Sequence, residues 1–139
     1  MVIQRWQSVL LFLVFILILT FALTPFATYT GQGNASAGLF VYDYPVILTV
    51  TVLIAVLVFI SIFLYKNLKR QMTVTLVTAF LIIADTISAI IVAYNSDVCA
   101  SPAYLGGIGL MFFAFILELM AWKLMKNDLN KLRSYDRLR

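Results

Sequence analysis

The chain has 139 residues, of which 63% are hydrophobic and only 12% are charged. Soluble domains carry roughly a quarter of charged residues, and a chain this short has too little interior to bury so much apolar surface. Composition therefore excludes a soluble domain, a disordered chain and a nucleic-acid-binding protein, and it predicts an integral membrane protein.

Four apolar stretches are long enough to cross a bilayer, whose core of about 30 Å requires about 20 residues in a helix. In chain order they cover about 8–24, 45–65, 72–94 and 103–122. The first ends before Pro25, which cannot continue a helix. We therefore expect one all-α membrane domain, a bundle of four transmembrane helices, followed by a tail at 123–139.

The positive charges predict the orientation of this bundle. The connections 26–44 and 95–102 contain no Lys or Arg. By the positive-inside rule, both termini and the middle connection are expected on the cytoplasmic side. The ten basic residues are Arg5 before the first span, Lys66, Lys69 and Arg70 between the second and third, and Lys123, Lys126, Lys131, Arg133, Arg137 and Arg139 after the fourth.

Aromatic residues predict the same boundaries, because Trp and Tyr favour the headgroup level of a membrane. Trp6, Tyr65 and Trp122 stand at the inner ends of the predicted spans and are expected to anchor them there. The outer ends carry Tyr29, Tyr42, Tyr44, Tyr94 and Tyr104.

The tail after the fourth span combines six basic residues with a helical apolar repeat. Met125, Leu129 and Leu132 recur at three or four residues, which predicts a basic amphipathic helix. Such a helix suits attachment to anionic lipid headgroups, and it also suits docking to a protein partner. Nucleic-acid binding would require more charges.

Both termini carry short motifs that resemble a known family. Residues 3–8 read Ile-Gln-Arg-Trp-Gln-Ser and residues 133–139 read Arg-Ser-Tyr-Asp-Arg-Leu-Arg. They are similar to the start and the end of domain-of-unknown-function family 4293, four-span inner-membrane proteins of Bacteroidota, in which an acid is also usual at Asp128. Val2, Trp6 and Lys131 depart from that pattern. The resemblance implies a bacterial inner-membrane location and no known activity.

Asp85 lies near the middle of the third predicted span, where an ionisable residue is a functional candidate. An ionised Asp there costs about 2.5–3.5 kcal/mol, whereas polar contacts between helices return about 0.6–2 kcal/mol. Thr75, Thr78, Ser88 and Ala89 share its helical face. This small and polar stripe suits either close helix packing or a hydrated seam.

Glu118 lies in the fourth predicted span, nearer its inner end. Small residues on the same face predict that it faces protein rather than lipid, either as an interfacial acid or paired with Arg5 or Lys123. At 1.5 Å per residue, Asp85 and Glu118 should differ in depth by about 10 Å, too far for a direct carboxylate pair. The small residues are Ala103, Gly107, Ala114 and Ala121.

Three roles remain open for Asp85. It could be a neutral acid that donates a hydrogen bond to a Thr or Ser, a contact to another subunit, or part of a proton or cation pathway. The glycine-rich segment 106–109 is interpreted as helix packing, and the connection 26–44 either joins two spans or offers a surface to a partner.

Three functional classes follow. An accessory or scaffold subunit of a larger membrane complex is favoured by the small size of the chain. A small homo-oligomeric transporter coupled to protons or cations through Asp85 is the alternative. An enzyme is disfavoured, because the sequence has no His, and the lone Cys99 cannot form an intramolecular disulfide or a thiolate metal cluster. We expect no cofactor and no metal.

Overall fold

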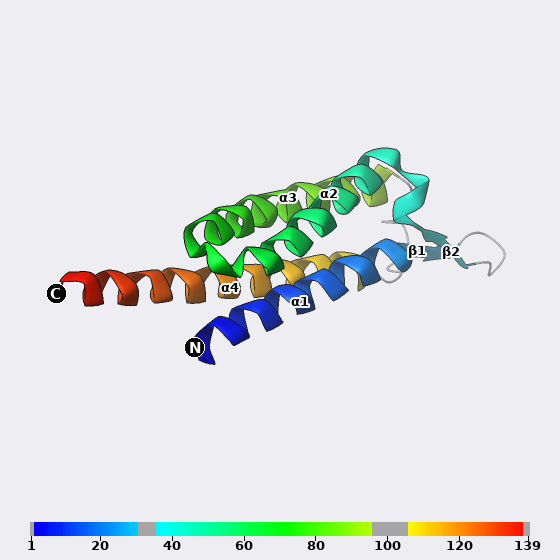
Figure 1. Cartoon of the computed structure of the whole chain (residues 1–139). Coiled ribbons are helices and arrows are strands. Elements are labelled where there is room, and N and C mark those ends of the chain that lie inside the picture. Colours follow the sequence, from blue (N-terminus) through cyan, green and yellow to red (C-terminus); the bar gives the residue numbers. More distant parts are fainter. Residues whose placement is uncertain (1, 31–35, 96–105, 138–139) are drawn as a thin grey trace.

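The computed structural model describes residues 2–30, 36–95 and 106–137 of the chain. In this part of the chain, four long helices alternate in direction: α1 (Val2–Leu23), α2 (Pro45–Phe63), α3 (Leu68–Asn95) and α4 (Gly106–Arg137). Neighbouring helices pack in the cyclic order α1–α2–α3–α4. The chain therefore forms an antiparallel four-helix bundle (Figure 1).

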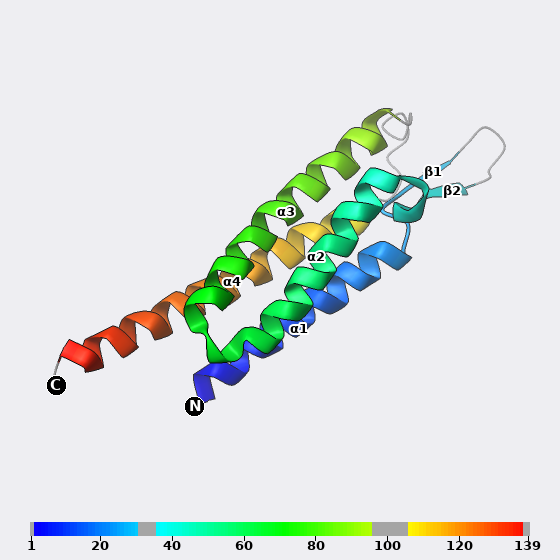
Figure 2. The ribbon, with the colours of Figure 1, turned by 45° about the horizontal axis from the view of Figure 1, so that its top comes forward.

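The two ends of the bundle differ. Both chain termini and the α2–α3 turn, a short 3₁₀ helix at Leu64–Lys66, lie at one end, here called the termini end (Figures 1 and 2). A β-hairpin lies at the other end, here called the hairpin end. It pairs β1 (Ala27–Thr30) with β2 (Ser36–Leu39) and is followed by a 3₁₀ helix at Val41–Asp43.

Buried positions recur on each helix after four and then three residues, the period of left-handed knobs-into-holes packing. Side chains on the opposite faces are large, apolar and exposed, as suits contact with lipid. All four helices are long and apolar enough to cross a membrane, which confirms the predicted four-span fold class. The buried residues that follow this repeat are Gln7, Leu11, Val14, Ile18 and Phe21 on α1; Ile47, Thr51, Ile54, Val58 and Ser61 on α2; Gln71, Thr75, Thr78, Ile82, Asp85 and Ala89 on α3; and Met111, Ala114, Glu118, Ala121 and Met125 on α4. Ala79 and Ala93 on α3 are buried outside the repeat.

The tail is continuous with the fourth span. The sequence predicted a span that ends near Trp122 and a helical tail after it, and α4 continues without interruption to Arg137. Residues 123–137 contain neither Gly nor Pro, so nothing in the sequence ends the helix there. The predicted start of this span, at 103, lies outside the described residues.

The connection after α1 folds back and closes the hairpin end. Phe26 and Ala27 are fully buried, and the Phe26 amide donates a hydrogen bond to the Leu39 carbonyl at 2.9 Å. The Phe26 ring lies 6.2 Å from the ring of Phe21 and 6.1 Å from that of Tyr44. No structure was predicted for 26–44; in its described parts, 26–30 and 36–44, the buried Phe26 and Ala27 are joined to a hairpin.

Gly107 allows the backbone at Phe26 to pack closely against α4. A Cβ atom at Gly107 would lie only 2.3 Å from Cα of Phe26, whereas a Cβ at Gly109 would meet nothing within 4 Å. Gly107 therefore packs against the backbone of the connection and not, as the sequence suggested, against another helix.

Substitution of Gly107 and of Gly109 by Ala should distinguish the effect of the close contact with Phe26 from the effect of helix propensity. Gly107→Ala should destabilise the fold by roughly 1–3 kcal/mol, because the Phe26 backbone must move. Gly109→Ala should be neutral or stabilising by up to about 1 kcal/mol, since Ala favours a helix. Thermal unfolding in detergent, followed by circular dichroism, measures both. Equal effects of the two substitutions would contradict the close approach at Gly107.

Candidate functional site: a buried polar seam

Among the residues whose burial the structure describes, eight polar side chains occupy the interior of the bundle, each at most 2% exposed. We call them the polar seam. They extend from the termini end to about the middle of α3, and the remainder of the interior, toward the hairpin end, is apolar. The residues of the seam are Gln7, Thr51, Ser61, Gln71, Thr75, Thr78, Asp85 and Glu118.

Asp85 contacts the neighbouring helix α2 rather than a residue of its own stripe. The Thr51 hydroxyl oxygen lies 2.7 Å from Oδ2 of Asp85 and 2.9 Å from the backbone carbonyl oxygen of Ile47. The other carboxyl oxygen, Oδ1, is buried and has no hydrogen-bond partner among the described residues. Asp85 thus joins α3 to α2 through one oxygen only.

Glu118 repeats this arrangement between α4 and α3. Its Oε1 is hydrogen-bonded to the hydroxyl of Thr78, which also lies 2.9 Å from the carbonyl oxygen of Thr75 and 3.2 Å from that of Val74. Its Oε2 is buried without a hydrogen-bond partner in the described part of the chain.

Hydrogen bonds continue from Glu118 to the termini end. Thr78 contacts the carbonyl of Thr75, and the hydroxyl of Thr75 lies 3.2 Å from that of Ser61. Gln71, in the first turn of α3, donates to the carbonyl of Ser61 at 3.1 Å. Glu118 is therefore linked by polar contacts to the end of the bundle.

Asp85 is separated from this chain of contacts. The Thr51–Asp85 and Ser61–Thr75 contacts fix how α2 and α3 are aligned, so Ile54 and Ile82 fall between them. Both isoleucines are fully buried. The two acids consequently lie about 10 Å apart in depth, at 1.5 Å per residue, and are not a direct pair.

The structure differs from the sequence analysis at two of the predicted residues. Ser88 is only partly buried, and its hydroxyl donates to the backbone carbonyl of Asp85 at 2.8 Å, not to the carboxyl group. Glu118 is fully buried within the bundle, in agreement with the prediction that it faces protein, but its partner is Thr78 and not the exposed Lys123. The side chain of Arg5 lies outside the described residues.

Four members of the seam were missed by the sequence analysis: Gln7, Thr51, Ser61 and Gln71. The signal was present, since Thr51 and Ser61 are the polar members of the repeat that buries Ile47, Ile54 and Val58. Polar residues at alternating spacings of four and three along every span, and not only along the spans that contain acids, indicate these positions.

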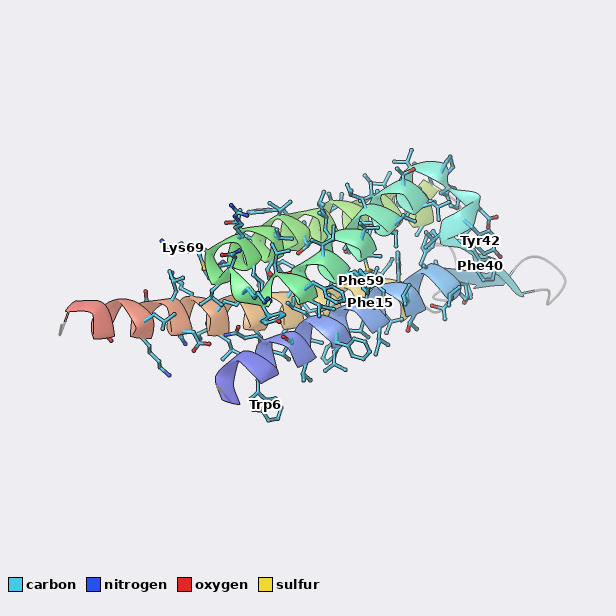
Figure 3. All side chains as sticks on the ribbon, in the orientation of Figure 1. Trp6, Phe15, Phe40, Tyr42, Phe59 and Lys69 are labelled. Carbon is cyan, nitrogen blue, oxygen red and sulfur yellow. The ribbon has the colours of Figure 1, made fainter. Side chains whose placement is uncertain are left out.

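The predicted basic and aromatic anchors lie on the outside of the bundle. Trp6 and Lys69 point away from the helices (Figure 3), and Trp122 is partly buried with Nζ of Lys126 5.0 Å from its ring centroid. The side chains of Arg133, Arg137 and Arg139 lie outside the described residues. Exposed anchors are Trp6, Tyr65, Lys66, Lys69, Arg70, Lys123, Lys126 and Lys131.

Gln7 connects the two ends of the chain. Its amide donates to Oδ2 of Asp128, so the first turns of α1 are tied to the C-terminal part of α4. Gln7 belongs to the N-terminal motif of the family resemblance, and Asp128 is the acid noted with it. Among the described residues, no group of three or more His, Cys, Asp or Glu is placed to hold a metal ion.

Four apolar helices around a buried polar seam define a multi-pass membrane protein. The family model named Domain of unknown function (DUF4293) matches residues 3–138, and the chain belongs to this uncharacterised family. No curated protein and no solved structure matches the chain.

The Thr51 hydroxyl should be needed for stability, because it is the hydrogen-bond partner of a buried carboxyl group. Thr51→Val keeps the shape of the side chain and should destabilise the bundle by about 1–2 kcal/mol. Thr49→Val is the matched control: it removes an equivalent hydroxyl, bonded to the carbonyl of Pro45, from the exposed face of the same helix. Denaturant unfolding in detergent measures both, and equal losses would contradict a specific role for Thr51.

Proposed function

We propose that this chain is a small polytopic protein of the bacterial inner membrane, with both termini in the cytoplasm, that acts as an accessory or scaffold subunit of a larger membrane complex. All ten basic residues lie before the first span, between the second and third spans, or after the fourth span. These segments belong to the termini end, and this placement supports the orientation. The proposal assigns no catalytic role and no cofactor to the chain.

The observation that carries the proposal is the C-terminal part of α4. Its end extends past the other three helices (Figures 1 and 2). Lys131 and Ser134 are exposed there, as is Leu132, at 56%. This segment offers a basic helical surface with an exposed apolar side chain, which suits binding to an acidic surface of a protein.

The direction of α4 favours a protein partner over the lipid surface for this segment. A helix that binds headgroups lies in the plane of the membrane, with its apolar face in the acyl boundary. The tail, however, continues the axis of a membrane-spanning helix, so it is directed away from the bilayer. Lys123 and Lys126, closer to the span, remain suited to contact anionic headgroups, and this accords with their exposure.

Photo-crosslinking from Leu132 tests the docking role. A benzophenone amino acid at this position, in cells at native expression, should give a defined adduct with another membrane protein that also copurifies in mild detergent. Because the contact is electrostatic, Lys131→Gln should reduce the yield several-fold, as should high salt. Lys69→Gln, at the α2–α3 turn, should leave the yield unchanged. Adducts with lipid alone, or monomer alone, would refute the accessory role.

A proton- or cation-coupled transporter is the second candidate, favoured by the unpartnered oxygens of Asp85 and Glu118. In the present conformation the fully buried Phe21 and Phe26 close the hairpin end. Transport therefore requires another conformation or an oligomer.

The transport candidate predicts pH- or cation-dependent flux in proteoliposomes that contain the purified chain. Asp85→Asn should abolish this flux, because it removes the titratable group midway across the bundle. Asp43→Asn, at an exposed residue of the hairpin end, should not change it. Flux that is absent from the parent protein, or unchanged in Asp85→Asn, would count against transport.

A further inference from the structure

We propose that Asp85 and Glu118 are two proton-binding sites within the bundle, each a neutral carboxylic acid that donates a hydrogen bond to a threonine hydroxyl. This inference goes beyond the accessory role and does not depend on it. It rests on the number of protons that the observed contacts require and on the charges around the two acids.

The contacts of Thr51 require one proton more than the hydroxyl can supply. A threonine hydroxyl has a single hydrogen but can accept as well as donate. Thr51 lies within hydrogen-bond distance of two acceptors, the Ile47 carbonyl and, if ionised, the Asp85 carboxylate. If Asp85 carries a proton on Oδ2, it donates to Thr51 and Thr51 donates to Ile47. Both contacts are then satisfied.

Thr78 presents the same problem more strongly. Its single hydroxyl hydrogen faces the carbonyl oxygens of Val74 and Thr75 as well as Oε1 of Glu118. An ionised Glu118 would compete with these carbonyls for one hydrogen. A proton on Oε1 lets Glu118 donate to Thr78, which leaves the hydroxyl hydrogen for a backbone carbonyl.

No described cation is placed to balance ionised acids. The groups that face the seam are the amide of Gln7 from α1, hydroxyls of α2 and α3, and the amide of Gln71; none carries a charge. The described Lys and Arg side chains are exposed, and the partly buried Asp128, bound to Gln7, is a further acid on this side. Two uncompensated carboxylates in a dry interior would be costly, whereas neutral acids are not.

The two sites differ in their access to water. Polar contacts connect Glu118 through Thr78, Thr75 and Ser61 to Gln71 at the termini end. The Thr75 hydroxyl also lies 3.9 Å from the sulfur of Met125, which belongs to a buried apolar cluster with Leu11 and Ala121. Asp85 lies behind Ile82 on that side, and Phe26 closes the hairpin side. The Glu118 proton should therefore exchange with water at the termini end much faster than the Asp85 proton does.

Infrared spectroscopy of the full chain in lipid bilayers at neutral pH tests the proposal. The carbonyl stretching band of a neutral carboxylic acid should be present, and Asp85→Asn and Glu118→Gln should each remove a distinct part of it. Asp43→Asn, at an exposed acid, should remove carboxylate bands only. Loss of carboxylate bands in the Asp85 or Glu118 variants would overturn the proposal.

Transfer of the wild-type chain to D₂O tests the difference in access. The Glu118 component should shift first and the Asp85 component about tenfold more slowly or slower still, because its exchange requires local opening of the bundle. Equal rates would overturn the unequal access.

Thr51→Val keeps the test decisive if Asp85→Asn does not fold. This variant retains the acid and should shift the Asp85 band without removing it, whereas Thr49→Val should leave the band in place. A spectrum of Thr51→Val identical to that of the wild type would overturn the Thr51–Asp85 assignment.

Discussion

A lipid bilayer offers no hydrogen-bond partners, and this constraint decides which face of each helix turns inward. The backbone N–H and C=O groups are hydrogen-bonded within each helix, so the polar side chains determine which face turns inward. The polar seam is the result: Gln7, Thr51, Gln71 and Glu118, from four different helices, are all buried within the bundle. Faces that carry large apolar side chains are left for the membrane.

The same polar contacts fix how the helices are aligned along the bundle axis. Thr51–Asp85 aligns α2 with α3, Thr78–Glu118 aligns α3 with α4, and Gln7–Asp128 aligns α4 with α1. The remaining interface, between α1 and α2, contains an aromatic contact between Phe15 and Phe59 at 5.7 Å (Figure 3). Two helices with a purely apolar interface could shift by one turn at a small cost in free energy. A buried polar pair opposes such a shift, because its members would find few other hydrogen-bond partners.

The fold was largely predictable from the sequence because composition and span length are properties of whole segments. The position of Asp85 at mid-span and its depth relative to Glu118 also follow from counting residues along a helix. The partner of Asp85 could not be obtained in this way, because Thr51 lies on another helix and the alignment of α2 with α3 is set by tertiary packing. Gly107 is similar: its role depends on Phe26, far away in the sequence.

Toward the termini end the interior combines the polar seam with the buried apolar cluster of Leu11, Ala121 and Met125, whereas toward the hairpin end the described interior is apolar. The Phe21–Phe26–Tyr44 ring contacts stabilise the apolar end, and the absence of a side chain at Gly107 leaves space for Phe26. Because the buried polar side chains of the described residues lie toward the termini end, we expect protons to exchange with water from that end. Glu118, connected to that end through Thr78, is then the acid whose protonation can follow the surrounding water. Asp85 is the acid that a change in helix packing would have to expose, which makes the Ile54–Ile82 layer the barrier between the two sites.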